Sequence, residues 1–404
     1  MTDVLSVSRA GPETGTQPRQ QGGMFASSST RSRTGVLHVI APGDVGGAES
    51  VVRVLATAQR SLGARVEVAA IVQSKDAAGG FLAALRDASI ETHRILVGGR
   101  DYRRERRMLA AICEASSPDI VHSHGYRADV VDALHLRRDV PIVSTVHGFT
   151  GGDLRNRLYQ WLQCRAYRRF DAVVAVSEPL RRQLAPRIGP KRLHVVPNAY
   201  APESESLSKE AARVALGLPN DEFLVGWVGR LSREKGPDVL LDALARREMP
   251  ASALAVFVGE GPLAPELRQR TVELRLDARV TWKGRVANAS HLLAAFDVLV
   301  VSSRTEGGPM VVLEAMATGT PIVATQVGGV PDMLPRGTAL LVSPESPSEL
   351  AAAIRDAFMD PEATRTRARA ARRRLDAEYG LSSWAERYEA IYQAARRLAA
   401  QRLQ

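Results

Sequence analysis

Two glutamates separated by eight positions mark the part of the sequence that is richest in potential chemistry. Glu306 stands in the loop that follows the apolar run 297–301, and Glu314 lies about one turn into the helix expected after that loop. The neighbours of Glu314 are apolar, so we expect its carboxylate to be buried, and burying an unpaired carboxylate is costly. A pair of ligand hydroxyls would satisfy this carboxylate, and so would a nearby arginine.

The loop between the two glutamates has the features of an anion-binding helix start. Gly307 and Gly308 let the backbone approach a ligand closely. Pro309 suits the first residue of a helix, because its fixed φ and its missing N–H are both tolerated there. We expect the amides of Met310 and the next two residues to point out of the helix start, where negative charge is favourable.

A pair of cations follows the apolar run 223–229. The chain continues through Arg230 and Lys235 into a predicted helix, so two positive side chains leave the end of one strand. Cations and helix amides at one crevice suit a diphosphate. Taken by itself, this pattern would favour the alternative of solvated charges in a loop.

Two other strand ends carry candidate residues. The first predicted strand leads to Gly46 and Gly47, which could present amide hydrogens to an anion, although a plain tight turn has the same pattern. His147 closes another predicted strand, with Gly148 behind it. Ligands of open parallel sheets bind beyond the carboxyl ends of the strands, so this histidine could face a substrate. A satisfied structural histidine is the alternative.

The sequence contains no recognisable metal site. It has no Asp-x-Asp motif and no histidine, cysteine and carboxylate cluster at metal-ligand spacing. We therefore expect neither a metal nor a cofactor, and a reaction that expels a diphosphate would rely on protein cations and helix amides. The two cysteines, Cys113 and Cys164, are expected to be small buried apolar side chains in a reducing compartment.

Strands and helices in alternation must position these residues. From Val36 onward, short runs rich in valine and isoleucine alternate with amphipathic stretches, which indicates strand-helix units around a parallel sheet. The alternation lapses and then restarts, so the sequence predicts an α/β chain with two doubly wound domains in tandem. The expected parts are a disordered tail 1–33, a first domain 34–200, a linker 201–220, a second domain 221–382 and a terminal helix 383–404.

The terminal helix has apolar residues at helical spacing, namely Trp384, Tyr388, Ile391 and Tyr392. It should therefore dock on an apolar surface. Crossing back to the first domain and packing on the second domain are both open to it.

Composition limits the classes of function. The chain has 404 residues, of which 45% are hydrophobic and 24% charged, as in folded globular proteins. Its formal net charge of +10 fits a nucleic acid, an anionic membrane or a phosphorylated substrate as partner. No apolar stretch approaches the roughly 18 residues of a membrane span, and the tail lacks the apolar segment of a secretory signal. We therefore expect a cytoplasmic protein.

Much of the positive charge lies in the segment 153–192, which carries ten basic and three acidic residues. Leu154, Leu158, Trp161 and Leu162 give its first part an apolar helical face. A basic amphipathic helix can lie on an anionic bilayer, which at the inner face of the membrane would suit a lipid-linked acceptor. A surface helix packed on its own sheet is the alternative.

Five motifs in order resemble those of a known family. They are G-G-A-E after the first strand, T-V-H-G, V-G-R-L-S-R-E-K-G, V-G-E-G-P and E-x₇-E. They resemble the retaining GT-B glycosyltransferases of family 4 type (glycosyl transferases group 1), over nearly everything from Val36 to the C-terminus. The resemblance implies two Rossmann-like domains facing each other across a cleft. It also implies transfer of a sugar from a UDP- or GDP-activated donor to an acceptor hydroxyl in polysaccharide, glycolipid or small glycoside synthesis.

The resemblance implies roles in binding the nucleotide part of the donor. Arg230 and Lys235 would bind the diphosphate, and Glu314 would accept hydrogen bonds from the ribose hydroxyls. Gly259 and the main chain near Arg285 would border the base.

The resemblance also implies roles at the transferred sugar. Glu306 and the loop 307–310 would hold its hydroxyls, and His147 would face it from the other domain, both supporting the transition state without a covalent nucleophile. Gly46 and Gly47 would line the crevice near the phosphate. The loop reads Gly-Gly-Pro where many relatives have Gly-Phe-Gly, so the resemblance does not define its contacts to the sugar.

Two other functions remain open at this stage. A sugar-nucleotide 2-epimerase has the same architecture and binds a similar donor without any acceptor. A basic nucleic-acid-binding protein would use the positive charge, but the sequence has no recognisable RNA or DNA module and only 5% aromatic residues for base stacking.

Overall fold

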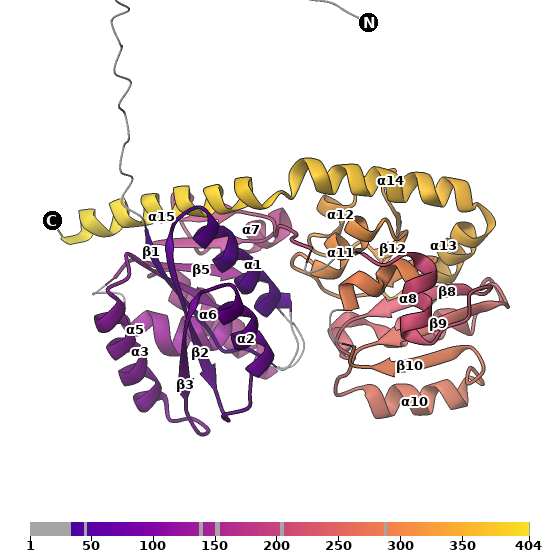
Figure 1. The fold of residues 1–404 in the computed structure, drawn as a ribbon, viewed down its shortest axis with the longest axis horizontal. Helices are drawn as coiled ribbons and strands as arrows, with labels where there is room; N and C mark the ends of the chain where they lie inside the picture. Colours follow the sequence, from indigo (N-terminus) through magenta and orange to yellow (C-terminus); the bar gives the residue numbers. More distant parts are fainter. Residues whose placement is uncertain are drawn as a thin grey trace, which may run out of the picture. The chain divides into compact units, whose positions relative to one another are not determined.

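Two parallel sheets organise the chain, one in each half (Figure 1). The computed structural model describes residues 34–43, 47–136, 140–149, 154–202, 206–286 and 289–403. The predicted tail and Gly46 lie outside these ranges.

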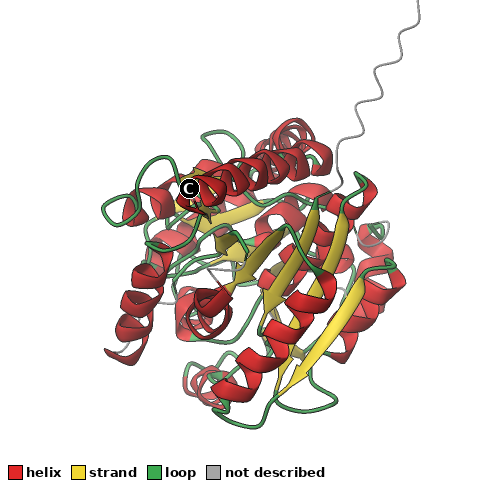
Figure 2. Cartoon of the chain, turned by 90° about the vertical axis from the view of Figure 1, so that its left-hand side faces the viewer, coloured by secondary structure: helices red, strands yellow, loops and turns green. Residues whose placement is uncertain are grey.

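The first half forms a sheet of seven parallel strands with helices on both faces (Figure 2). Its elements are β1 (Gly35–Ile40), α1 (Gly47–Ser61), β2 (Arg65–Val72), α2 (Gly79–Asp87), β3 (Glu91–Leu96), α3 (Tyr102–Ser116), β4 (Ile120–His124), α4 (Gly125–Arg127), the π-helix η1 (Ala128–Ala133), α5 (Leu134–Leu136), β5 (Ile142–Val146), α6 (Leu154–Tyr167), β6 (Ala172–Ala175), α7 (Glu178–Leu184) and β7 (Leu193–Val195). The strand order is β3-β2-β1-β4-β5-β6-β7, so the direction of winding reverses between β1 and β4.

The second half forms a sheet of six parallel strands. Its elements are α8 (Lys209–Leu216), β8 (Phe223–Val228), the 3₁₀ turn η2 (Arg233–Lys235), α9 (Pro237–Leu244), β9 (Ala253–Val258), α10 (Ala264–Glu273), β10 (Val280–Gly284), the 3₁₀ helix η3 (Ala289–Ala295), β11 (Val298–Val301), α11 (Met310–Thr318), β12 (Ile322–Thr325), α12 (Val330–Met333), β13 (Leu340–Val342), α13 (Pro347–Met359), α14 (Pro361–Glu378) and α15 (Leu381–Leu403). The strand order is β10-β9-β8-β11-β12-β13, with the reversal between β8 and β11.

The strands are apolar runs because parallel strands covered by helices are buried on both faces. Every residue of β1, β4 and β5 is buried, and these strands begin or end within two residues of the runs predicted from the sequence. The prediction of two doubly wound domains is confirmed.

Helix α8 occupies part of the stretch that the sequence analysis assigned to a linker. Ser208 caps the helix, and its side chain accepts a hydrogen bond from the amide of Ala211. Arg213 is fully buried against the second domain, where its guanidinium donates to the carbonyl of Ala295 at 2.9 Å and to Asp297 at 2.8 Å. The linker prediction was therefore too long, because a helix of eight residues with several charges shows too little apolar periodicity to be recognised.

The terminal helix α15 packs on the first domain, the first of the two alternatives left open by its sequence. Trp384, Tyr388 and Tyr392 are buried in one cluster with residues of β1 and α1, such as Val36 and Leu55. Figure 1 shows α14 over the second sheet and α15 continuing from it along the first. Among the described residues, no helix is both long and apolar enough to cross a bilayer.

Candidate active site

The loops that follow β8 and β11 meet because these strands are neighbours at the reversal of the second sheet. The Nζ of Lys235 donates to both carboxylate oxygens of Glu306, at 2.7 and 2.9 Å. The hydroxyl of Ser303 donates to the same carboxylate at 2.7 Å. The sequence analysis gave Lys235 and Glu306 separate roles, and the structure joins them in one ion pair with the glutamate side chain largely buried.

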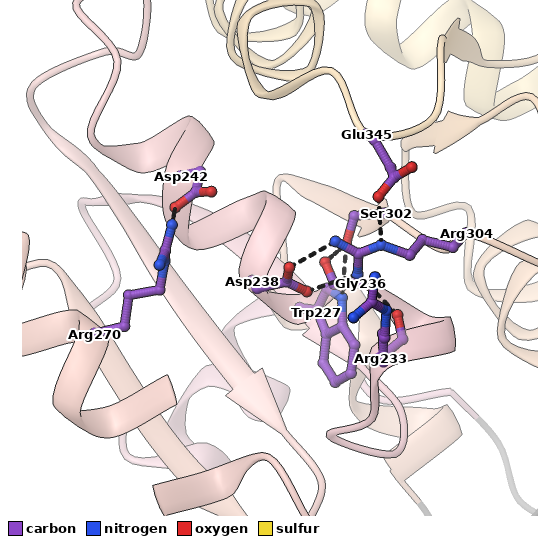
Figure 3. Close-up of polar contacts among 9 residues, drawn as sticks. All are labelled: Trp227, Arg233, Gly236, Asp238, Asp242, Arg270, Ser302, Arg304 and Glu345. Atoms are coloured by element: carbon purple, nitrogen blue, oxygen red, sulfur yellow. Dashed lines mark hydrogen bonds and ion pairs between the residues drawn. The ribbon is translucent and has the colours of Figure 1, made fainter. Parts of the chain in front are cut away.

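Arg304 ties these two loops together, as Figure 3 shows. Its guanidinium donates to both carboxylate oxygens of Asp238 at 2.9 and 2.7 Å, to Glu345 at 2.9 Å and to the carbonyl of Arg233 at 2.8 Å. The hydrogen bonds to Asp238 raise the pKa of Arg304 further above its usual range. Arg304 therefore fixes the start of α9 and the turn η2 to the loop that carries Glu306.

A second set of hydrogen bonds holds the turn that follows Lys235 against the end of β11 (Figure 3). The indole of Trp227 donates to the hydroxyl of Ser302 at 3.1 Å, and that hydroxyl donates to the carbonyl of Gly236 at 2.6 Å. Gly236 has a φ of +62°, and a Cβ there would overlap the carbonyl oxygen of Ser302. The turn requires glycine at this position, because its backbone is left-handed there and lies in close contact with the residue that follows β11.

The helix start after Glu306 differs by one residue from the prediction. Pro309 has a φ of −68° and a ψ of 121°, so it is the residue before the helix, and α11 begins at Met310. The amide of Val312 donates to the carbonyl of Pro309 at 3.2 Å, so it does not point outward as expected. Extended backbone at proline is compatible with its fixed ring, and the helix turn closes on the proline carbonyl instead.

The glycine loop before α11 is held by the first domain. A Cβ on Gly307 would overlap the carbonyl oxygen of His147, so the two backbones are in close contact. The amide group of Asn198 donates to the carbonyl of Gly308 at 2.9 Å. The sequence analysis did not single out Asn198, whose contact depends on how the two domains meet.

A cavity of about 430 Å³ lies at this meeting of loops and is lined from both halves of the chain. Most of the predicted site residues line it, namely Gly47, His147, Arg230, Lys235, Glu306, Gly307, Pro309, Met310 and Glu314. Phe149, Trp227 and Ser303 line it too and were not predicted. Residues from four separate strand ends thus converge on one space, which has the size of a small-molecule pocket.

The remaining described candidates stand elsewhere. Gly259 and Gly308 do not line the cavity, and neither does the exposed Arg285. The amide of Gly259 donates to the carbonyl of Gly284 at 2.7 Å, and a Cβ there would overlap the carbonyl oxygen of Gly229. Gly259 therefore lets β9 end directly under the turn that leads to Arg230.

Two expectations about burial need correction. Glu314 is only half-buried, because its side of α11 faces the cavity instead of the apolar core. Cys164 is buried, but Cys113 is only half-buried, and neither forms a disulfide.

His147 follows β5 and is half-buried at the cavity. Its Nε2 lies 3.2 Å from Nδ1 of His124, whereas its Nδ1 is buried and has no hydrogen-bond partner in the part of the chain that the structure describes. Burial lowers the pKa of His147 to about 4, because the charged ring would lose its hydration. The ring is therefore neutral near pH 7.

Three further histidines, which the sequence analysis did not notice, lie together behind His147. His38 of β1 is the register partner of His122 of β4, and His124 follows on the same strand. Their ring nitrogens are close enough to share a metal ion, as are the side chains of Glu67, Glu91 and His93. The prediction that no such cluster exists was wrong, because strand pairing joins positions that are far apart in the sequence. The alternation of His122 and His124 in a predicted strand was the available signal.

The two sheets and the shared cavity define a glycosyltransferase of the GT-B type. Two family models match the chain, Glycosyltransferase Family 4 over residues 45–204 and Glycosyl transferases group 1 over residues 208–374. The chain belongs to this family of glycosyltransferases and is a transferase enzyme.

Similar proteins include two curated enzymes and one solved structure. TuaC of Bacillus subtilis, named for teichuronic acid biosynthesis, is 34% identical over 277 residues, which are 62% of this chain and 65% of TuaC. The D-inositol 3-phosphate glycosyltransferase of Kineococcus radiotolerans is 33% identical over 314 residues, or 69% of this chain and 72% of that enzyme. The chain thus spans about two thirds of the length of these relatives. The crystal structure of HepE from Anabaena with UDP-glucose is 24% identical and has a TM-score of 0.77, covering 90% of this chain and 99% of HepE.

Proposed function

We propose that this enzyme transfers a sugar from a nucleotide-sugar to an acceptor hydroxyl, with retention of anomeric configuration and without a metal ion. The observation that carries this proposal is that Arg230, Lys235, Glu306, Glu314 and His147 line the same cavity. Two cations, a helix start and carboxylates in one space match the parts of an activated sugar. TuaC and the inositol phosphate enzyme are both named as glycosyltransferases, which agrees with this reading.

In this proposal the cations Arg230 and Lys235 bind the diphosphate of the donor. As the anomeric bond breaks, negative charge grows on the leaving phosphate, and a cation fixed beside it stabilises the transition state more than the ground state. Lys235 is fixed by Glu306, and Arg230 lines the same cavity from an exposed position. A fixed lysine loses little freedom when the donor binds, so more of its attraction is available to the leaving group.

In this proposal the nucleoside part of the donor binds at the start of α11. The first amides of a helix have no acceptor within it, and the helix dipole adds positive potential there. Met310 and Val311 begin α11 at the cavity, and Glu314 stands about one turn further along on the same side. The carboxylate of Glu314 can accept hydrogen bonds from both hydroxyls of a ribose.

The transferred sugar would lie between Glu306, the glycine loop and His147. The carboxylate of Glu306 is already engaged by Lys235 and Ser303, so it suits electrostatic support of a cationic ring better than covalent attack. Retention then requires that the acceptor attacks on the side from which the diphosphate leaves. A phosphate oxygen of the donor takes the acceptor proton in this scheme.

Binding and product analysis test this function. In a thermal-shift screen with UDP-, GDP- and ADP-sugars, one class of donor should raise the melting temperature by mass action. Incubation with that donor alone should give no epimer, since an epimer would identify a 2-epimerase. Transfer to an added acceptor should give a product whose anomeric configuration matches the donor by NMR. An inverted product, or the absence of any shift, would refute the proposal.

We also propose that the outer face of α6 touches an anionic surface, consistent with a cytoplasmic enzyme that uses a lipid-linked acceptor. The helix packs on its domain through residues such as Gln163 and Tyr167, which both donate to buried Asp129. Leu158 and Trp161 remain 53% and 57% exposed. Two residues of the apolar face expected from the sequence, Leu158 and Trp161, are thus exposed among exposed arginines. Leu162 is half-buried, and the side chain of Leu154 lies outside the described part of the structure.

Co-sedimentation with liposomes tests this surface. The enzyme should sediment with vesicles that contain anionic lipid at low salt, and Trp161→Ala should weaken this binding several-fold. A matched variant, Val272→Ala, changes an equally exposed apolar residue on α10 and should bind as the wild type does. Equal loss in both variants, or no sedimentation at all, would rule the surface out.

A further inference from the structure

A line of hydrogen bonds runs from the interior of the first domain to the histidine at the cavity. Oε1 of Gln59 lies 2.8 Å from Nε2 of His38, and Nδ1 of His38 lies 3.0 Å from Nε2 of His124. Nδ1 of His124 lies 3.2 Å from Nε2 of His147. We call these four residues, together with Tyr392, the histidine relay.

Tyr392 of α15 begins the relay and also begins a second branch. Its hydroxyl accepts a hydrogen bond from Nε2 of Gln59 at 2.8 Å and lies 2.8 Å from Nδ1 of His122. Nε2 of His122 lies 2.8 Å from the hydroxyl of Thr145, which is 3.1 Å from the hydroxyl of Tyr388. All six ring nitrogens of His38, His122 and His124 are thereby engaged within the protein.

Each histidine of the relay is neutral near pH 7, because burial lowers the pKa of His38 and His147 to about 4 and that of His124 well below its usual value. A neutral imidazole carries one N–H and one acceptor nitrogen. The position of every proton in the relay therefore follows from the group at its far end.

The side-chain carbonyl oxygen of Gln59 fixes these positions, because it can only accept a hydrogen bond. Nε2 of His38 must therefore donate to it, which leaves Nδ1 of His38 as an acceptor. Nε2 of His124 must then donate to His38, and Nε2 of His147 must donate to His124. His147 is the last histidine of this series, and its Nδ1 is left with a lone pair that has no partner among the described residues.

We propose that the histidine relay sets the tautomer of His147, so that its Nδ1 is kept as a hydrogen-bond acceptor for a hydroxyl of the transferred sugar. Gln59, His38, His124 and Tyr392 are then positioning residues of the active site. The use of the lone pair rests on the proposed function, whereas the tautomer itself does not.

Two observations favour a functional role over simple core packing. A buried acceptor without a partner destabilises the folded protein, so each such atom calls for an explanation. In addition, His147 lines the cavity, so a donor hydroxyl that enters there can satisfy this atom. Because Tyr392 belongs to α15, docking of the terminal helix on the first domain completes the relay.

NMR of the ligand-free enzyme labelled with ¹⁵N in its eight histidines reads the tautomer directly. His147→Asn identifies the His147 signals by their disappearance. We expect Nε2 of His147 to be protonated and Nδ1 to be bare at pH 7. A proton on Nδ1 would mean that the relay runs in the opposite direction and would overturn the proposal, whatever the enzyme transfers.

Two tyrosine variants separate the relay from packing. Tyr392→Phe removes the acceptor of Gln59, and Tyr388→Phe removes the partner of Thr145 on the second branch, and both rings are buried on the same helix. We expect Tyr392→Phe to mix the tautomers of His147 and to lower kcat about tenfold with little change in KM for the donor. Tyr388→Phe should leave the tautomer and kcat unchanged.

Gln59→Met gives an independent variant, because it keeps the length of the side chain and removes both of its hydrogen bonds. It should also mix the tautomers of His147. A single unchanged tautomer in Tyr392→Phe and Gln59→Met would overturn the proposal, as would equal losses of kcat in both tyrosine variants. Saturating the wild type with donor should shift the Nδ1 resonance, and an unmoved resonance would refute the hydroxyl contact.

Discussion

Lys235 and Glu306, which are 71 positions apart in the sequence, form a bidentate ion pair at the cavity. Their strands are neighbours only because the winding of the second sheet reverses between β8 and β11. The pair places a fixed positive charge beside a negative one. A diphosphate bound there would be attracted by the lysine and repelled by the glutamate, so the two residues should affect binding in opposite directions.

We expect Lys235→Met to weaken binding of the donor and of a free nucleoside diphosphate by tenfold or more, since a charged contact to phosphate is lost. Glu306→Gln keeps the shape of the side chain and frees the lysine charge, so it should tighten binding of the diphosphate several-fold. It should nevertheless lower kcat, because the support for a cationic sugar is reduced. Calorimetric titration and steady-state kinetics measure both effects, and weaker diphosphate binding in both variants would contradict this assignment.

The strand ends could be located from the sequence, and the pairing between them could not. Valine and isoleucine runs indicate buried parallel strands, and ligands of such sheets bind at their carboxyl ends. This pattern predicted His147, Arg230 and Glu306 as site residues, and all three line the cavity. Which ends face each other depends on strand order. Strand order in turn depends on how helices pack across the whole sheet, which no local pattern records.

The histidine cluster shows the same limit. His38 and His122 are adjacent only through the register of β1 with β4, and Gln59 and Tyr392 reach them from two helices. Single histidines and glutamines in apolar segments look like isolated polar residues in a sequence. Their meaning comes from long-range hydrogen bonds, because buried polar groups must find partners wherever the fold provides them.

Gly307→Ala tests the contact between the glycine loop and the first domain. A methyl group at this position would overlap the carbonyl oxygen of His147, so the loop or the domain contact must shift. We expect kcat/KM to fall at least a hundredfold, since misplacing substrate groups by about 1 Å has effects of that size. Gly80→Ala serves as the matched control and should keep full activity, because the added methyl would meet no described atom within 4 Å other than its chain neighbours and the backbone of its own helix. Equal activity in the two variants would show that the contact is unimportant.

Arg304→Lys tests the clamp beneath the site. Lysine keeps the charge but cannot form the two parallel hydrogen bonds to Asp238, so the turn that carries Lys235 should loosen. We expect KM for the donor to rise and kcat to fall, each about three- to tenfold. Figure 3 also shows Arg270 of α10, which pairs with Asp242. Asp242 lies on α9, the helix that also carries Asp238. Arg270→Lys should leave both constants unchanged, and similar kinetics for the two variants would argue against a specific clamp.

The buried histidines should make the folded state sensitive to mild acid. Burial lowers the pKa of His38 and His147 to about 4 from 6.5, so the unfolded chain binds more protons than the folded chain between these values. The contribution of these two histidines to the free energy of unfolding should therefore be complete above pH 6.5. It should decrease as the pH falls toward 4. The slope is up to about 1.4 kcal/mol per pH unit for each such histidine.

Urea unfolding at pH 7, 6 and 5 measures this slope. His147→Gln removes one of the two rings whose pKa is lowered to about 4 and should reduce the loss of stability between pH 7 and 5. The exposed His135 provides the comparison, because burial lowers its pKa less than that of His147, so His135→Gln should reduce the loss of stability by less than His147→Gln does. The same stability at all three pH values would contradict the prediction, because it would mean that folding does not lower the pKa of these histidines.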